Sequence, residues 1–145
     1  MERLISIDYG DKRIGIAVSD PFNNMALPLQ TIIKKDRFTI KPYVKQIGIL
    51  IKEYQASKII LGFPKNMDNT IGERGQITLD FKDRLSRNFK KIEIILWDER
   101  LTSIASKKLL SLQGVPLIKQ KFVIDQVSAS LILQNYLDYT RGIDG

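Results

Sequence analysis

The 145-residue chain contains no cysteine and no histidine, and both absences limit its chemistry. Without cysteine there are no disulfides and no thiolate metal sites, and without histidine no imidazole can act as a metal ligand or general base. No apolar run reaches the roughly 18 residues that a membrane-spanning helix needs, and the N-terminus leads into a strand-like segment rather than a signal sequence. Any acid–base or metal chemistry must therefore use carboxylates, and we expect a cytoplasmic protein with no membrane contact.

The remaining composition is that of a globular protein with a basic surface. Hydrophobic residues make up 43% of the chain and charged residues 27%, and the length suits one domain that spans residues 1–145. Lysine and arginine outnumber aspartate and glutamate by 23 to 16, which gives a net charge of +7. This excess favours phosphate-rich partners such as nucleic acid without identifying one.

The hydrophobic periodicity predicts an α/β fold with a mixed sheet. The expected elements are strands at about 3–8, 14–20 and 26–33, a helix at about 39–54, a strand at 57–63, a helix at 76–89, a strand at 92–97, a helix that Thr102 or Ser103 caps and that ends near 112, a basic loop, and a last helix at 122–139 before a frayed end. Three sequential strands form an antiparallel meander, and later strands join in parallel through right-handed crossovers. The arrangement resembles the ribonuclease H-like fold, a five-stranded sheet of order 3-2-1-4-5 flanked by helices.

The first hairpin places a carboxylate at the edge of this sheet. Asp8 ends the first apolar strand, and Gly10 lies in the short turn that follows. Because the first strand is central in the expected sheet, Asp8 lies at the middle of its carboxyl edge, where ligands bind in open α/β sheets. We interpret Asp8 as a metal ligand; the alternative is a structural carboxylate that accepts hydrogen bonds from hairpin amides.

Four segments together carry a family resemblance that covers essentially the whole chain in order. They are residues 8–15, 62–68, 97–103 and 124–129. In these motifs the chain resembles the YqgF family of Holliday-junction-resolvase-like proteins, which are implicated in maturing the 5′ end of small-subunit ribosomal RNA. The resemblance implies a nuclease that uses Mg²⁺ or Mn²⁺ and acts on precursor ribosomal RNA or branched DNA, with ribosomal assembly particles as further expected partners.

The same resemblance implies which acidic residues act. The family's acidic positions match Asp8, the Asp98–Glu99 pair and Asp125. Magnesium prefers hard oxygen ligands and retains several waters, so a few carboxylates suffice to hold it. We therefore expect Asp8, Glu99 and Asp125 to be both catalytic residues and metal ligands, with Asp98 as a further catalytic candidate.

The chain departs from the family pattern in the second motif. Where the family usually has Asp-Gly-Ser or Asp-Gly-Thr, this chain has Asp68-Asn69-Thr70. Asparagine tolerates a positive φ better than most residues, so the turn can be kept.

Strand spacing favours Glu99 over Asp98 as the ligand. If one strand separates the first strand from the last, Asp8 lies roughly 9 to 10 Å from the end of the last strand, and a longer side chain just beyond that end reaches a shared metal more easily. The alternative is that both acids form ion pairs with Arg100 or stabilise the N-terminus of the next helix.

Asp125 has a competing interpretation. In the first turn of the expected last helix it would stabilise the helix dipole at an ordinary surface site. However, it shares an otherwise apolar stripe with Ala129, Ile132 and Tyr136. A carboxylate that points toward the sheet is costly unless a cation or a hydrogen-bond donor pairs with it. We therefore favour the ligand role.

Six basic residues would crowd the same edge and bind phosphates of nucleic acid. They are Lys12, Arg13, Lys65, Arg100, Lys119 and Lys121. Two other functions remain open: an RNA-binding ribosome-assembly factor that does not cut, and an actin-like nucleotide-binding protein, although the chain is short for the latter. The sequence is compatible with a monomer or a homodimer.

Overall fold

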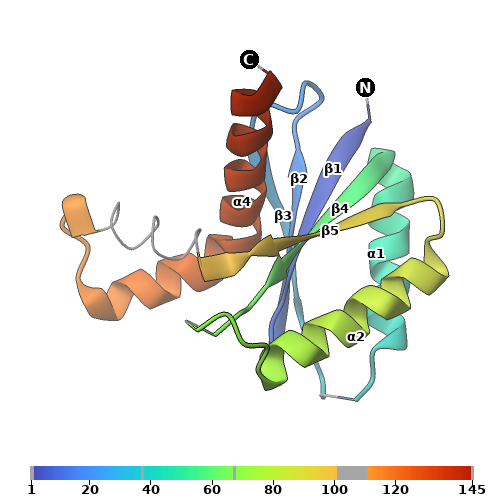
Figure 1. Cartoon of the computed structure of the whole chain (residues 1–145), viewed down its shortest axis with the longest axis horizontal. Coiled ribbons are helices and arrows are strands. Elements are labelled where there is room, and N and C mark those ends of the chain that lie inside the picture. The colour runs from blue at the N-terminus through green and yellow to red at the C-terminus, as the bar shows by residue number, and fades with distance from the viewer. Residues whose placement is uncertain (1, 37, 67, 101–110, 145) are drawn as a thin grey trace.

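The computed structural model describes residues 2–36, 38–66, 68–100 and 111–144, without the side chains of residues 117, 118, 120–126 and 142–144. It is a layered α/β structure (Figure 1). Helices α1 and α2 lie on one face of the sheet and helix α4 on the other. The sheet edge between these layers carries the predicted site.

The strands and helices match the predicted elements closely, apart from the last helix. The elements are β1 (Arg3–Tyr9), β2 (Arg13–Ser19), β3 (Ala26–Ile33), α1 (Lys41–Tyr54), β4 (Ala56–Phe63), α2 (Glu73–Asn88), β5 (Glu93–Asp98) and α4 (Leu117–Asp144). The predicted helix between the last strand and Leu112 falls mostly on residues 101–110, outside the described residues. Among the helices that are described, none is both long enough and apolar enough to cross a membrane.

The strand order β3-β2-β1-β4-β5 confirms the predicted order 3-2-1-4-5. β1 pairs antiparallel with β2 and parallel with β4, and β4 pairs parallel with β5. The carboxyl ends of β1, β4 and β5 therefore meet at one edge, with β1 in the centre of the sheet.

Alternation along β1 separates two hydrophobic cores. Ile5 and Ile7 belong to the larger core, which α1 and α2 cover. Leu4 packs in the second core under α4, where the buried Ser6 Oγ donates a hydrogen bond of 2.6 Å to the carbonyl of Ala129. Asp8 continues the even-numbered series, so it lies on the α4 face.

The last helix is longer than predicted, and part of the prediction around it is wrong. α4 spans Leu117–Asp144 rather than 122–139, so Lys119 and Lys121 lie in a helix and not in a basic loop, and the segment after Tyr139 is helical to residue 144. The helix begins directly after Pro116, which fits the start of a helix because the residues there have no intrahelical donor bond to lose. Lysine is a good helix former, so a run of basic residues does not by itself indicate a loop.

Candidate active site

The hairpin between β1 and β2 fixes the backbone around Asp8. Asp8 is half-buried and pairs in register with Gly15. In the turn, the N–H of Gly10 donates to the carbonyl of Arg13 at 2.8 Å, and a Cβ on Gly10 would lie only 2.6 Å from that oxygen. The turn therefore requires glycine, and it holds Asp8 at the end of its strand.

Helix α4 contributes a direct partner for Asp8. Ser128 Oγ donates a hydrogen bond of 2.5 Å to Asp8 Oδ2. The neighbouring bond from Ser6 to Ala129 fixes this part of α4 against β1. Ser128 was not among the predicted site residues; the available signal was its place in the same motif as Asp125, one helical turn later.

Glu99 lies on the same face of the sheet, just past the end of β5. Its side chain packs over Gly62, where an added methyl group would overlap the Glu99 carboxylate and lie 2.7 Å from Ile132 Cδ1. Gly62 thus provides the space that lets the Glu99 side chain lie across the end of β4. This is the reach across one intervening strand that the spacing argument requires.

The environment of Glu99 disfavours its charged form. Burial raises its pKa to about 9, and the charge of Asp8 and a hydrogen bond with Asp8 act in the same direction. The charge of Asp98 adds to this effect, whereas the Arg74 guanidinium opposes it. At neutral pH the Glu99 carboxyl therefore favours its protonated form.

Asp98 has a different partner from Glu99. The Arg100 side chain donates to both Asp98 oxygens, with Nη2 at 2.7 Å from Oδ2 and Nε at 3.0 Å from Oδ1. The remaining bonds of Arg100 run to the loop after β4: Nη1 donates to the carbonyl of Asn66 and Nη2 to Asn69 Oδ1, each at 2.9 Å. Hydrogen bonding by Arg100 lowers the pKa of Asp98. All three nitrogens of the Arg100 guanidinium are thus engaged inside the protein, and its predicted contact with nucleic acid stays a prediction.

The loop after β4 keeps its turn despite the missing glycine. Asn69 has a φ of 70°, in the left-handed region that asparagine tolerates, as expected from the sequence. The N–H of Asn69 donates to Asn66 at 2.9 Å, and Thr70 donates from its N–H and its hydroxyl to Asp68 Oδ1. These bonds and Arg100 hold the loop beside the end of β5.

Asp125 and Lys121 lie in α4, but their side chains are outside the described part of the chain. The helix start corrects one premise of the prediction. Because α4 begins at Leu117, Asp125 is in the third turn and not in the first, where the helix dipole acts on a carboxylate. Its backbone position is one turn before Ser128, the residue that contacts Asp8.

A cleft of about 510 Å³ opens beside Asp8. Asp8 and Ser128 line one side of it, and the exposed side chains of Lys12 and Arg13 from the hairpin line another. Two of the predicted phosphate-binding residues therefore share a cleft with the predicted metal ligand. A phosphate group has the size and charge to enter it.

The other two basic candidates, Lys65 and Lys119, do not line the cleft beside Asp8. Lys65 follows β4, with its ammonium 5.9 Å from the Phe63 ring centroid, and its charge contributes to the lowered pKa of Asp98. Lys119 is exposed in the first turn of α4. Both stay predictions as nucleic-acid contacts.

Arg74 is a site residue that the sequence did not indicate. From the first turn of α2, its Nη2 donates to the carbonyl of Tyr9 at 2.7 Å, and its Nη1 lies 3.7 Å from Asp11 Oδ1. It therefore ties the hairpin that carries Asp8 to α2. Nothing in the spacing of Arg74 marks this role.

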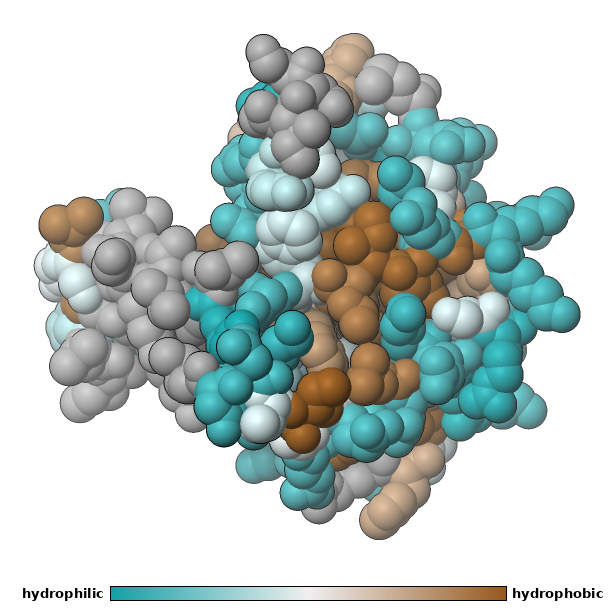
Figure 2. Space-filling model, in the orientation of Figure 1, coloured by the Kyte–Doolittle hydropathy of each residue, from teal (hydrophilic) through white to brown (hydrophobic). Residues whose placement is uncertain are grey.

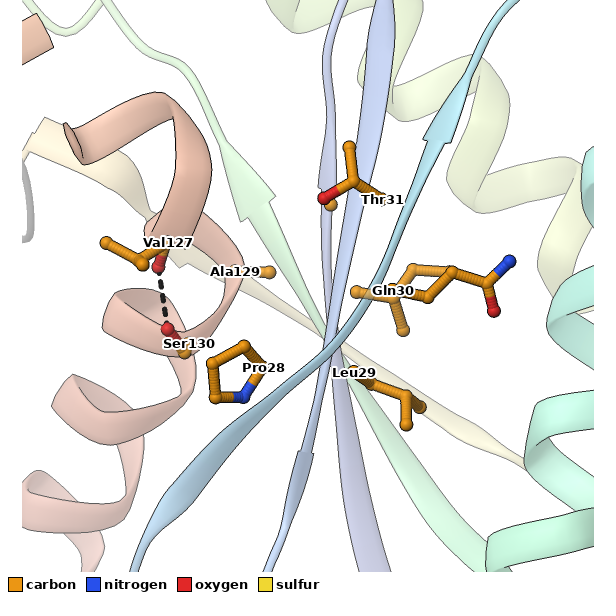
Figure 3. A pocket seen from close by; sticks show the side chains of 9 residues that line it. Pro28, Leu29, Gln30, Thr31, Val127, Ala129 and Ser130 are labelled. Atoms are coloured by element: carbon orange, nitrogen blue, oxygen red, sulfur yellow. Dashed lines mark hydrogen bonds between the residues drawn. The ribbon is translucent and has the colours of Figure 1, made fainter. Parts of the chain in front are cut away.

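A second, smaller cleft of about 260 Å³ adjoins the first between edge strand β3 and α4 (Figure 3). Figure 3 shows Pro28 and Thr31 of β3 on one side and Val127, Ala129 and Ser130 of α4 on the other. Ser130 Oγ donates to the carbonyl of Val127 at 2.8 Å. The two clefts share Thr31 and Gly15, so the opening beside Asp8 continues along the outer edge of the sheet.

The residues at this edge fit a divalent cation. Asp8 and Glu99 offer hard oxygen donors, which Mg²⁺ and Mn²⁺ prefer. Burial, together with the nearby charge of Asp8, raises the pKa of Glu99, as expected where two carboxylates lie close together. Among the described residues no cluster of three or more acidic side chains is found, so a third carboxylate would have to come from outside them.

Comparison with known proteins gives a consistent family. A family model described as "RuvX: Holliday junction resolvase" matches residues 2–139. A protein of Acetivibrio thermocellus with the name "Putative pre-16S rRNA nuclease" is 47% identical over 136 residues, which are 94% of this chain and 95% of the relative. A protein of Halothermothrix orenii with the same name is 40% identical over 143 residues, 99% of each chain.

Solved structures share the fold at low sequence identity. The Thermus thermophilus RuvC in complex with a Holliday junction substrate superposes with a TM-score of 0.57 at 11% identity, and the match covers 98% of this chain and 97% of RuvC. The fowlpox virus Holliday junction resolvase has a TM-score of 0.51 at 16% identity, with coverage of 94% and 99%. These likenesses confirm the predicted ribonuclease H-like fold.

Proposed function

The chain belongs to the RuvX family of Holliday junction resolvases, and we propose that it is a nuclease that hydrolyses phosphodiester bonds in nucleic acid. The observation that carries the proposal is the Asp8–Glu99 pair. The Asp8 carboxylate on β1 and the Glu99 carboxylate just past β5 meet, both half-buried, at the carboxyl edge of the sheet, beside a cleft lined by Lys12 and Arg13. This combines a cation site with a phosphate-binding surface.

We propose that the substrate is precursor small-subunit ribosomal RNA, cut to mature its 5′ end. The relatives named for precursor 16S ribosomal RNA match almost the full length of this chain at 40 to 47% identity. The junction-resolving structures are similar at 11 to 16% identity, which speaks for a shared fold alone. Branched DNA is the second substrate to test. Ribosome assembly would place the protein in the cytoplasm, in contact with assembling ribosomal particles.

Asp8, Glu99 and Asp125 are the residues that would hold a divalent cation. When bound, such an ion supplies Lewis-acid stabilisation of the charge that develops on the phosphoryl group. Ser128 positions the Asp8 carboxylate by donating to Oδ2. Glu99 favours its protonated form at neutral pH, so it would have to lose this proton to act as a ligand.

The other site residues would bind the substrate or position neighbouring parts of the protein. Lys12 and Arg13 would bind the phosphates that flank the cut bond, because they line the cleft beside Asp8. Asp98 acts through Arg100, which fixes the loop after β4 against the end of β5. We therefore assign Asp98 a positioning role rather than a ligand role.

A substrate panel tests the function. Purified protein is incubated with precursor ribosomal RNA that carries the 5′ extension, with a four-way DNA junction and with matched duplexes, in Mg²⁺, in Mn²⁺ and in EDTA. We expect cleavage of the RNA precursor that requires the metal and that Asp8→Asn lowers more than about a hundredfold, since removing even a supporting residue of a metal site costs 10- to 100-fold.

Asp83→Asn on the exposed side of α2 is the matched control and should cut at the wild-type rate. Cleavage that persists in EDTA, or an Asp8→Asn variant as active as the wild type, would refute the carboxylate site. Binding of the precursor without cleavage of any substrate would instead identify an assembly factor that does not cut.

A further inference from the structure

A groove of about 660 Å³ runs between α1 and α2, on the face of the sheet opposite to α4. Its floor is apolar: Val44 is buried, Phe89 is half-buried and Ile49 is 51% exposed. A Cβ on Gly48 would lie 3.0 Å from the Phe89 ring, so the glycine lets that ring pack closely on α1. Figure 2 shows hydrophilic side chains along the right-hand side of the molecule, where Figure 1 places α1 and α2, next to a hydrophobic area near the middle of the view.

All charged side chains that line this groove are cations. Lys41, Lys45 and Lys52 come from α1 and Arg84 from α2, and none of the described lining residues is acidic. The three lysines form no ion pair with any other residue in the described part of the chain. With a rise of 1.5 Å per residue they are spaced by roughly 6 and 10 Å along the helix. Such a row of positive charges is complementary to the regularly spaced charges of a polyanion.

The groove adjoins a second cleft that leads to the site. Arg84 lines both, and the second cleft, of about 420 Å³ and mixed charge, shares Asp11 of the hairpin with the cleft beside Asp8. At its mouth Phe38 is 86% exposed. The Phe38 N–H donates to Asp36 Oδ1 at 2.8 Å, which fixes the backbone that presents the ring.

We propose that this groove, together with Phe38, binds a single-stranded stretch of nucleic acid that extends from the cleavage site. Lysines that follow a backbone and an aromatic ring on which a base stacks are the two elements of sequence-tolerant single-strand binding. An acidic peptide would also match the charge, but the continuity through Arg84 and Asp11 to the cleft beside Asp8 favours the substrate itself. The inference rests on the proposed function, since it assigns the path of that substrate.

The salt dependence of binding tests the lysine row. A labelled 20-nucleotide single-stranded RNA is titrated in EDTA at several salt concentrations and followed by fluorescence anisotropy. Lys45→Gln/Lys52→Gln should flatten the slope of log K against log salt by about 1.4, because each lost single-strand phosphate contact removes about 0.7. The control Lys90→Gln/Lys91→Gln removes the same charge from exposed residues that do not line the groove and should leave the slope unchanged. Equal effects of the two pairs would overturn the proposal.

A pair of exposed phenylalanines tests the stacking contact. Phe38→Ala should weaken binding of the same RNA about tenfold, the loss of one base–aromatic stack. Phe22→Ala, in the turn between β2 and β3, removes a ring that is 69% exposed and should have no effect. An affinity unchanged by Phe38→Ala, or lowered equally by both, would overturn the assignment of Phe38.

Two further measurements separate this inference from the nuclease activity. Asp8→Asn should lose cleavage but keep the wild-type salt dependence of RNA binding. If the wild-type protein binds RNA with the expected salt dependence but cuts no substrate, the nuclease function alone is refuted. A protein that cuts precursor RNA while Lys45→Gln/Lys52→Gln leaves the slope unchanged would refute the groove alone. Tighter binding of a polyglutamate peptide than of RNA would show that the groove recognises acidic protein, contrary to the proposal.

Discussion

Two acidic residues that are adjacent in the sequence, Asp98 and Glu99, lie in opposite electrostatic environments. Asp98 accepts hydrogen bonds from the Arg100 guanidinium, which lower its pKa. Glu99 is buried beside Asp8, and this environment raises its pKa to about 9. Asp98 and Arg100 thus form a complete ion pair, whereas Asp8 and Glu99 form an incomplete group that has no ion-pair partner among the described residues.

This difference separates a structural carboxylate from a functional one. An ion pair that already joins the loop after β4 to β5 stabilises the fold and gains little from a ligand. Two carboxylates held together without a cation cost stability, and the protein retains them in the place where β1, β4 and β5 end together. The cost is recovered when a cation binds. The comparison therefore supports the proposal that Asp8 and Glu99, rather than Asp98, are the metal ligands.

After Asp8→Asn, the largest effect is expected for Asp125, the candidate third ligand beside Asp8 and Glu99. Asp125→Asn should weaken both Mg²⁺ binding and cleavage by about 10- to 100-fold. Stability should change little, because Asp125 is in the third turn of α4, beyond the first turn where the helix dipole acts. Calorimetric titration with Mg²⁺, cleavage rates and thermal melts on the same variant check all three quantities.

Asp138→Asn, on the same helix but exposed, is the control for Asp125→Asn and should change neither metal binding nor cleavage. A stability loss with retained cleavage would remove Asp125 from the site. The Asp8–Glu99 pair would then have to hold the cation with substrate oxygens and water alone.

Much of the fold could be predicted because each strand carries a plain signal. The apolar residues around Ile5 and Ile7 indicate β1, and the continuous apolar run of β4 indicates a buried parallel strand. Because β1 is central, it brings Asp8 to the middle of the carboxyl edge of the sheet. The spacing between strands also favoured Glu99 over Asp98 as the metal ligand, and the Glu99 side chain does lie beside Asp8.

The remaining features of the site depend on which side chains contact each other, and the spacing of residues in the sequence does not determine those contacts. Arg100 has two acidic neighbours in sequence, and only the three-dimensional arrangement pairs it with Asp98. Ser128 and Arg74 reach the hairpin from other elements, across 120 and 65 residues of chain. The early start of α4 was missed because lysines suit a solvated helix as well as a loop.

The next prediction is that the two acidic groups give opposite pH dependences of stability. The pKa of Glu99 rises from an ordinary 4.5 to about 9 on folding, so between these values the folded state binds more protons than the unfolded state. In EDTA the free energy of unfolding should therefore fall as pH rises from about 4.5 to 9. Asp98, with its lowered pKa, contributes stability that is present above its ordinary pKa of 3.8 and is lost as pH falls through its folded value.

Thermal melts between pH 5 and 9 check the Glu99 contribution. Glu99→Gln does not titrate, so its melting temperature should vary less with pH than that of the wild type. Mg²⁺ should stabilise the wild type most at high pH, because the ligand must be deprotonated. A wild-type slope that persists in Glu99→Gln would assign the titration to another group.

The smallest effect is expected at the complete pair. Asp98→Asn keeps the side-chain volume and one acceptor for Arg100 but loses the charge, so it should cost about 1 to 3 kcal/mol of stability, the range for hydrogen bonds to charged groups. Cleavage should stay within about tenfold of the wild type, since Asp98 acts only through the loop. Asp138→Asn breaks an exposed pair in which Arg141 Nη2 is 3.8 Å from the carboxylate, and it should cost less than about 1 kcal/mol. Urea unfolding and cleavage rates measure both quantities. If Asp98→Asn abolished cleavage and left stability unchanged, Asp98 would belong with Asp8 and Glu99, and the contrast between the two groups would fail.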